Sequence, residues 1–408
     1  MFLSKDRHIT HMDLDTFYVS VECLRNSKLA GKPVLIGGTS DRGVVASCSY
    51  EARKFGIHSG MPMRAAKNLC SHAIVVKSDF ESYSKYSKLV TEVIRAKVPM
   101  FEKASIDEFY IDLTGMDKFF GCLKFSEELK QKITQESGLC ISYGLASNKL
   151  VSKVATNEVK PNGQLQIIFG NEKTFLSPLS IMKIPGIGKQ TGYKLLKMGV
   201  ETVKTLSEIP LSLMQNLLGK NGIELHQRAN GIDDSPVVPY REQQSISTEQ
   251  TFESDTIDMV FLYKQLATMT EKISYELRSK NKLTGCIAVK IRYSDFQTEQ
   301  MQASINYTAS DHDLLTEAKE LFEKLYTRRL LIRLIGVRFS DLISGTHQVN
   351  LFSDTQEQLK LYQAIDSVKK QYGEKFIMKA IAADVNKSER PVAKKSKVYK
   401  RLIPIPGR

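Results

Sequence analysis

The chain has 408 residues, too many for one ordinary hydrophobic core, and its length predicts about two to four domains. Its 58 Lys and Arg against 45 Asp and Glu give a formal net charge of +13, which favours a polyanionic partner. No apolar run approaches the ~20 residues of a membrane span, and the first residues lack the apolar core of a signal peptide, so we expect a cytoplasmic protein with no membrane partner.

The first part of the chain alternates strand-like and helix-like stretches. The segment HITHMDLD reads as a strand and runs into a helix with apolar positions at Phe17, Val21 and Leu24. Two short strands follow, KPVLIGG and GVVASCSY. The next helix, YEARKFG, is expected to end at Gly56, since glycine favours a helix C-terminus.

The middle of the first half predicts mixed α and β elements around a small sheet. The expected order is a helix at residues 83–98, a strand, a turn, a strand at 104–115, a helix at 125–136, a strand at 139–146 and a final helix. We expect Ser147 to cap the last helix, whose apolar positions fit helical spacing.

The second half predicts a helical part and a separate α/β part. Residues 170–233 hold short helices punctuated by Gly and Pro, with no evident strand, and the stretch IDDSPVVPYRE reads as an interdomain linker. The elements beyond it follow the order βαββαβ, a split βαβ arrangement that predicts an independent domain. A helix is expected near residues 359–371, followed by a basic tail after Lys387. We expect this tail to be disordered rather than to contact DNA.

Two acids stand side by side in ASIDEFYIDLTG, which otherwise reads as a buried strand. Adjacent side chains of a straight strand point to opposite faces, so Asp107 and Glu108 can converge only at a hairpin turn or a bulge. A second pair lies in the first strand, where Asp13 follows apolar residues that a sheet would bury. For Asp15, capping of the following helix is at least as good an account as metal binding. The residues expected to face the core are Phe109, Ile111 and Leu113.

Carboxylates that converge on one point repel each other unless divalent cations neutralise them. The six cysteines and seven histidines form no ligand cluster, which argues against a zinc site and a disulfide framework, and we expect no catalytic histidine. Hard oxygen ligands suit Mg²⁺. Two such ions roughly 3.5–4 Å apart can activate a hydroxyl and stabilise a leaving pyrophosphate in an in-line displacement.

Five motifs, in this order and at these spacings, resemble those of the Y-family translesion DNA polymerases: DLDTFYVSVE, VVASCSYEARKFGI, SIDEFYIDLTG, GLASNKLVSKVATNEVKPNG and IPGIGK. The resemblance covers residues from about 8 to 340 and is greatest to bacterial DNA polymerase IV and the catalytic subunit of DNA polymerase V. It implies an α+β multidomain fold, a right-hand polymerase with an added little finger. The implied domains are a palm at 1–23 and 78–168, fingers at 24–77, a helix-hairpin-helix thumb at 169–233, a linker at 234–242, a βαββαβ little finger at 243–342 and a C-terminal segment at 343–408.

The resemblance also implies the roles of the acids. Asp13, Asp107 and Glu108 would bind the metal ions, with the backbone carbonyl of Leu14 as a further ligand and Glu108 nearest the primer 3′-hydroxyl. Tyr18 matches the steric gate of the family, an aromatic ring beneath the incoming sugar that clashes with a ribose 2′-hydroxyl. Without the neighbouring motif, Tyr18 would be interpreted as a core aromatic residue.

A nucleotide-binding pocket is expected around the second motif. Tyr50 and Arg53 are three positions apart on a predicted helix and share a face, so both could reach a triphosphate, to which Arg53 could donate paired hydrogen bonds. Lys160 precedes a turn, where a lysine is ordinarily solvated, but its place in KPNG implies a triphosphate contact. Other residues implied to line the pocket are Phe17, Ala46 and Ser47.

A helix-hairpin-helix is expected at IPGIGKQTGYKLL. Gly186 and Gly188 lead into a helix and let backbone N–H groups approach a DNA phosphate, while Lys189 adds positive charge. For an isolated GIG motif, a simple helix and turn is the alternative. The DNA-binding interpretation is favoured here because the motif follows a palm-like domain in the chain.

The strand GCIAVKIRYSD alternates an apolar face with a basic one. Lys290 and Arg292 lie on the basic face, as a sheet laid along a phosphate backbone requires, although an ordinary solvated face is the alternative. Arg338 lies in a strand that resembles the last little-finger strand of the family, which implies a phosphate contact.

The motif QVNLF resembles the peptide by which bacterial polymerases bind the sliding clamp. It implies that Gln348, Leu351 and Phe352 are anchors in clamp pockets. Five residues match by chance often, but the position just beyond the little finger favours clamp binding.

We therefore expect a monomeric, template-directed DNA polymerase of the translesion type. It would add deoxynucleotides to a primer 3′-hydroxyl without proofreading, with primer–template DNA, deoxynucleoside triphosphates and a sliding clamp as partners. A non-catalytic DNA-binding repair scaffold is one alternative, although it would have no need for three mutually repelling acids. A nucleotide cyclase is another, but it leaves the hairpin and the βαββαβ domain unexplained.

Overall fold

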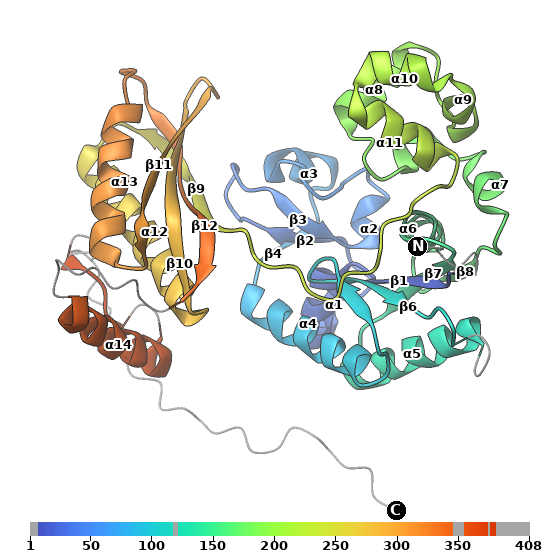
Figure 1. Cartoon of the computed structure of the whole chain (residues 1–408), viewed down its shortest axis with the longest axis horizontal. Coiled ribbons are helices and arrows are strands. Elements are labelled where there is room, and N and C mark those ends of the chain that lie inside the picture. The colour runs from blue at the N-terminus through green and yellow to red at the C-terminus, as the bar shows by residue number, and fades with distance from the viewer. Residues whose placement is uncertain (1–6, 117–120, 346–354, 374–375, 381–408) are drawn as a thin grey trace, which may run out of the picture. The chain divides into compact units, whose positions relative to one another are not determined.

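The chain divides into two compact units, Met1–Arg241 and Glu242–Arg408, which hold separate hydrophobic cores (Figure 1). The structure is a computed structural model and describes residues 7–116, 121–345, 355–373 and 376–380. Within these ranges, no helix combines the length and the apolar character needed to cross a bilayer.

A five-stranded sheet forms the centre of the first unit. Its strands lie in the order β5 (Phe101–Lys103), β6 (Glu108–Asp112), β1 (Ile9–Leu14), β7 (Ile141–Ala146) and β8 (Gln164–Gln166). All neighbours are antiparallel except the parallel pair β7 and β8. One face packs against α4 (Phe80–Arg95) and α5 (Cys122–Ser137), and α6 (Lys149–Glu158) packs on the strands from the other side.

The alternation of side chains along β1 and β6 decides which residues α6 covers. Met12, Leu14, Phe109 and Ile111 are buried in one core together with residues of α4 and α5. Because successive side chains of a strand point to opposite faces, the polar residues between them must lie on the side of α6. The expectation that Phe109, Ile111 and Leu113 face the core is confirmed.

A small three-stranded sheet forms the part of the first unit expected to be the fingers. Its order is β3 (Val45–Cys48), β2 (Val34–Gly37) and β4 (Ile74–Lys77), and only β2 and β4 are parallel. The helical elements near it are α1 (Phe17–Arg25), η1 (Ser27–Leu29), α2 (Tyr50–Arg53) and α3 (Met63–Leu69). The sequence patterns did not predict β4 or α3.

Short helices follow, as expected, without a strand in residues 170–233, all of which the structure describes. They are α7 (Glu172–Leu176), η2 (Ile181–Lys183), α8 (Lys189–Lys197), α9 (Val203–Glu208), α10 (Leu211–Leu218) and α11 (Lys220–Ala229). Their apolar residues share a core with α6, so this helical part is anchored to the first unit.

The expected helix cap at Ser147 is wrong. Asn148 caps α6, because its side-chain oxygen accepts a hydrogen bond from Val151 N at 2.9 Å. The hydroxyl of Ser147 instead donates to Glu172 at 2.5 Å. Both residue types make good caps, so the choice depends on the tertiary contact with α7.

The expected linker is tied to the first unit by a buried charge. Glu102 accepts hydrogen bonds from Lys149 Nζ at 2.7 Å, from Val238 N at 2.9 Å and from Arg241 Nη2 at 3.2 Å. Asp233 accepts from Leu150 N at 2.9 Å at the start of α6.

The second unit has the predicted βαββαβ order. Its sheet has the antiparallel strand order β11 (Thr298–Thr308), β10 (Lys282–Tyr293), β12 (Ile332–Ser344) and β9 (Ser245–Thr256). The helices α12 (Met259–Ser279) and α13 (Asp311–Leu325) cover one face of this sheet (Figure 1).

A last helix, α14 (Thr355–Tyr372), contacts the rest of the second unit through charged side chains. Arg278 of α12 donates to Asp366 at 2.7 and 2.9 Å and to Asp311 at 2.5 Å. Burial acts against the guanidinium charge, but the hydrogen bonds to Asp366 and the charge of Asp311 raise the pKa of Arg278 above its ordinary value. The C-terminal helix expected from its sequence pattern is therefore fixed by residues remote in the chain.

Candidate active site

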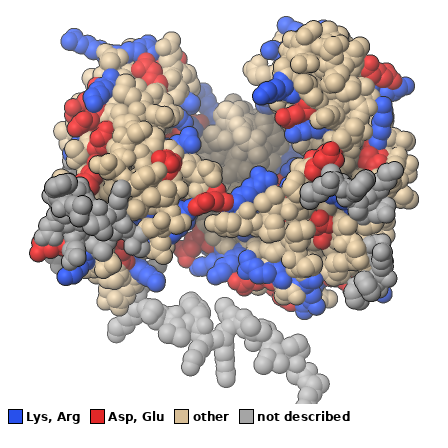
Figure 2. Space-filling model, in the orientation of Figure 1, with Lys and Arg blue, Asp and Glu red and all other residues tan. Residues whose placement is uncertain are grey.

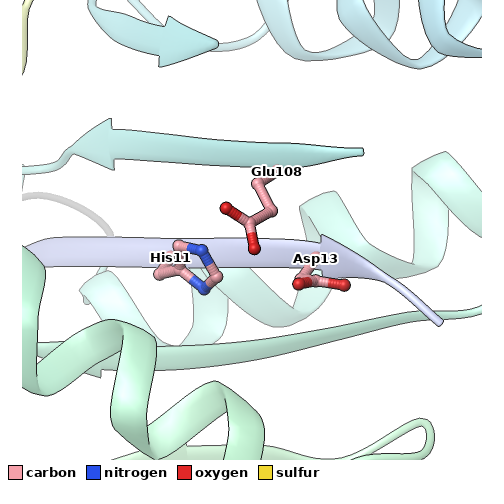
Figure 3. A group of neighbouring side chains, drawn as sticks. All are labelled: His11, Asp13 and Glu108. Carbon is pink, nitrogen blue, oxygen red and sulfur yellow. The ribbon is translucent and has the colours of Figure 1, made fainter. Parts of the chain in front are cut away.

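Asp13 and Glu108 face each other across neighbouring strands. They are directly paired in the antiparallel register of β1 and β6, and both side chains lie on the face toward α6 (Figure 3). One carboxylate oxygen of each lies within 4.8 Å of the other and of a ring nitrogen of His11. Two acids and an imidazole thus converge at a place where a divalent cation could bind.

Asp107 lies in the hairpin between β5 and β6, the kind of position that the sequence predicted for it. It lies just before β6, its carbonyl accepts a hydrogen bond from Leu14 N at 3.1 Å, and its carboxylate accepts from the hydroxyl of Ser105 at 2.5 Å. The carboxylate of Asp107 is not part of the cluster with His11, but it lines the same cavity as Asp13.

Two lysines supply the positive charge that these acids need. Lys160 forms an ion pair with Asp13, and Lys153 of α6 contacts both carboxylate oxygens of Glu108 at 2.7 and 2.6 Å. Burial raises the pKa of the Asp13 carboxyl to about 7. The ammonium of Lys160 opposes this rise, whereas the negative charges of Glu108 and Asp107 add to it. A buried acid with so raised a pKa is typical of a functional site.

His11 was not expected to have a role, yet it lies in this cluster. Its Nδ1 is 2.9 Å from the hydroxyl of Thr156, and its Nε2 is buried without a hydrogen-bond partner. Burial lowers the pKa of His11 well below its ordinary value, and the cations of Lys153, Lys160 and Lys149 lower it further. The imidazole is therefore neutral, with a lone pair on one of its two ring nitrogens.

A cavity of about 250 Å³ opens beside Asp13 and brings together most of the residues predicted for the nucleotide. Two of its lining residues, Thr16 and Ser59, were not predicted. Glu108 and Tyr50 were predicted but are not among its lining residues. The predicted residues that line it are Asp13, Leu14, Phe17, Tyr18, Ala46, Ser47, Arg53, Asp107 and Lys160.

The ring of Tyr18 is fixed by other aromatic rings. It stacks on Tyr83 with 4.4 Å between centroids and meets Phe80 edge to face at 5.8 Å. Burial and the charge of Asp107 raise the pKa of Tyr18, so its hydroxyl is neutral. A ring held in this way can act as a rigid wall of the cavity.

The expectation that Asp15 caps the following helix is wrong. Thr16 is the N-cap of α1, in a left-handed conformation with φ 41°, and makes no side-chain cap hydrogen bond. Asp15 is buried and accepts from the Ser142 hydroxyl at 2.9 and 3.0 Å and from Asn162 N at 2.7 Å. It thus ties the loop that carries Lys160 to the end of β1.

Tyr50 and Arg53 contact each other at the edge of the cavity. The guanidinium of Arg53 lies 5.0 Å from the centroid of the Tyr50 ring, and the Tyr50 hydroxyl is 3.4 Å from Asp15. Burial, followed by the charge of Asp15, raises the pKa of Tyr50. Arg53 therefore lines the cavity, and the ring of Tyr50 lies against its guanidinium.

The hairpin before α8 needs a glycine at position 186. Gly186 has φ 98°, where an added Cβ would also collide with the guanidinium of Arg228. Arg228 of α11 donates to Pro185 O at 2.7 Å and so holds the hairpin in place. Gly188 is the N-cap of α8, and Lys189 is the exposed first residue of that helix.

The alternation predicted for β10 is confirmed. Its apolar residues are in the core of the second unit, and Lys290, Arg292 and Arg338 share the opposite face of the sheet, Arg338 pairing with Ala288 in the register. Lys290 contacts Glu249 at 2.8 Å, so this face is not purely basic. Figure 2 likewise shows acidic side chains interspersed with basic ones on the visible face of the molecule.

Some predicted residues cannot be placed, and two residues beyond those that line the cavity, His11 and Lys153, were also not predicted. The expected clamp anchors Gln348, Leu351 and Phe352 lie outside the described residues. His11 was missed although it shares a strand face with Asp13 two positions later, a signal that the sequence offered. No local pattern could have identified Lys153, because its pairing with Glu108 depends on how α6 packs on the sheet.

Comparison with known proteins gives consistent matches along the chain. Residues 12–157 match the impB/mucB/samB family, residues 243–351 match the C-terminal domain of that family, and residues 182–233 match the DNA polymerase-iota thumb domain. DNA polymerase IV of Dehalococcoides mccartyi strain CBDB1 is 38% identical over 371 residues, which are 90% of this chain and 95% of that protein.

Two further comparisons agree with these matches. DNA polymerase IV of Clostridioides difficile strain 630 is 34% identical over 89% of this chain and 98% of its own length. A solved chimera of the Y-family DNA polymerases Dbh and Dpo4 aligns with a TM-score of 0.73 and 25% identity, over 83% of this chain and 100% of that one.

Proposed function

The chain belongs to the Y-family of DNA polymerases, and from this premise we propose that it performs nucleotidyl transfer at Asp13, Asp107 and Glu108. It is a template-directed DNA polymerase of the translesion type, so it binds primer–template DNA and deoxynucleoside triphosphates and uses divalent metal ions. The observation that carries the proposed site is the cavity of about 250 Å³ beside Asp13, which is lined by most of the residues predicted for a nucleotide.

The metal ions are proposed to be two Mg²⁺ ions. The donors fit a hard divalent cation, since the carboxylates of Asp13 and Glu108 converge and Asp107 and Leu14 line the adjoining cavity. When bound, such ions activate the primer 3′-hydroxyl and stabilise the leaving pyrophosphate. Asp13, Asp107 and the carbonyl of Leu14 would hold them on the nucleotide side, and Glu108 on the side of the primer.

The nucleotide is proposed to lie in the cavity with its triphosphate toward the basic residues. Arg53 and Lys160 would bind phosphate oxygens, and a nucleotide would release Lys160 from its ion pair with Asp13. Tyr18 would close the cavity below the sugar and exclude a ribose 2′-hydroxyl. Residues proposed to complete the pocket are Phe17, Ala46, Ser47 and Tyr50.

The DNA is proposed to contact both units. The backbone at Gly186 and Gly188, with Lys189, would bind the primer–template backbone from the thumb. Lys290, Arg292 and Arg338 would contact phosphates along the little-finger sheet. The protein is further proposed to be a monomer and to bind the sliding clamp through QVNLF. It is also proposed to lack proofreading.

Primer extension tests the site. Asp107→Ala combined with Glu108→Ala is expected to abolish extension of a primed template with Mg²⁺, while affinity for the same DNA changes less than about threefold, because neither acid is proposed to bind the duplex. Surviving extension in the double variant would refute the metal assignment. A well-folded wild-type protein that binds DNA but extends no primer would favour the non-catalytic scaffold.

A further inference from the structure

Lys153 contacts the proposed catalytic acid and has no part in the function described so far. It lies on α6, and its Nζ is 2.7 Å from Oε1 and 2.6 Å from Oε2 of Glu108. Its side chain is 25% exposed and that of Glu108 is 22% exposed. Both oxygens of this carboxylate are therefore held by one ammonium group within a partly enclosed site.

The acids on this face of the sheet are matched one by one with lysines. Lys149, one helical turn before Lys153, pairs with Glu102 at 2.7 Å, and Lys160 pairs with Asp13. These pairs differ in setting. Glu102 is further bound by the backbone of Val238, which makes its pair part of the framework, whereas Glu108 has Lys153 as its partner at the cluster with His11 and Asp13.

A cation bound by Glu108 must share this carboxylate with the ammonium of Lys153. Two positive charges a few ångströms apart repel each other strongly where water is partly excluded. Without the lysine, however, Glu108 would lie beside the negative charges of Asp13 and Asp107 and would lose the ammonium group that binds both of its oxygens. The same side chain thus stabilises the metal-free site and disfavours the metal-bound one.

We propose that Lys153 is a built-in counter-ion of Glu108 that competes with the divalent cation and lowers the affinity of the site for it. Lys153 is a positioning residue in this scheme, because it acts on the metal ligand rather than on the substrate. Its effect would keep the metal occupancy of the site low until a nucleotide contributes its phosphate oxygens as further ligands. This inference rests on the metal site proposed above.

Equilibrium binding of Mn²⁺ to the full chain without DNA or nucleotide tests the inference, with free Mn²⁺ followed by electron paramagnetic resonance. Lys153→Gln is expected to tighten Mn²⁺ binding roughly tenfold, since it removes one nearby positive charge. Lys153→Arg keeps the charge and should leave affinity unchanged. Lys132→Gln is the matched control: it removes one positive charge at a 46% exposed side chain of α5 that pairs with Glu136, and should have no effect.

Thermal unfolding gives a second measurement. Lys153→Gln is expected to lower the midpoint in EDTA, because the repulsion among the acids is uncompensated, and to gain more from added Mn²⁺ than the wild type does. Lys153→Met keeps the aliphatic stem and carries the same expectations should the glutamine variant fail to fold. If neither variant folds, Lys153 is a structural residue and the proposal is wrong.

Glu108→Gln distinguishes an error in the metal site from an error in the role of Lys153. If it leaves Mn²⁺ binding unchanged, the metal site itself is misassigned. If it weakens binding while Lys153→Gln leaves affinity unchanged or weaker, the metal site stands and the role of Lys153 as a competitor is refuted.

Discussion

Asp13→Asn is expected to stabilise the metal-free protein at alkaline pH although it removes a proposed metal ligand. Burial is the main cause that raises the pKa of Asp13 from 3.8 to about 7. Since one pKa unit corresponds to about 1.4 kcal/mol, the fold disfavours the charged carboxylate by at most about 4 kcal/mol. Asparagine carries no charge to desolvate, but Lys160 loses its partner, so we expect a net gain of about 1–3 kcal/mol at pH 8.

The sign of the pH dependence follows from proton binding. Between pH 3.8 and about 7 the folded protein holds a proton on Asp13 that the unfolded chain has released. The stability of the wild type therefore falls through this range as pH rises, and the loss is complete above it. The advantage of Asp13→Asn should accordingly be largest at pH 8 and small near pH 4.

Urea-induced unfolding in EDTA at pH 4.5 and pH 8, followed by circular dichroism, measures this difference. Asp79→Asn is the control, because hydrogen bonds from Ser82 lower the pKa of Asp79 and its removal should not stabilise the protein at pH 8. A midpoint for Asp13→Asn at or below that of the wild type at pH 8 would refute the argument that burial strains this carboxylate. Primer extension by Asp13→Asn should be lost in either case.

Two other predictions follow from the structure. Tyr18→Ala removes the ring that stacks on Tyr83 and should let the enzyme incorporate ribonucleotides, which primer extension with each sugar measures; unchanged sugar discrimination would remove Tyr18 from its proposed role. Glu102→Ala leaves the buried ammonium of Lys149 unpaired and should cost about 3–5 kcal/mol of unfolding free energy, measured in urea. Glu81→Ala breaks an exposed pair with Lys85 and should cost less than about 1 kcal/mol; equal effects would show that burial is not the cause.

Most of the fold could be predicted because its signals are local. The βαββαβ order of the second unit and the strand β1 follow from the periodicity of apolar residues, and the structure confirms both. The strand β4 and the helix α3 were missed, since each is short and has only a brief apolar pattern. The caps expected at Asp15 and Ser147 were wrong because tertiary partners, Asn162 and Glu172, bind these side chains.

The sequence by itself determined that acids occur at Asp13, Asp107 and Glu108 in motifs of one polymerase family, because a motif is a property of residue order. Only the tertiary structure decided how these acids are balanced. The register of β1 and β6 pairs Asp13 with Glu108, and the packing of α6 on that face of the sheet brings Lys153 to within 2.6 Å of Glu108. An ion pair between residues on separate elements depends on the distance between them in space, which the order of residues along the chain does not state.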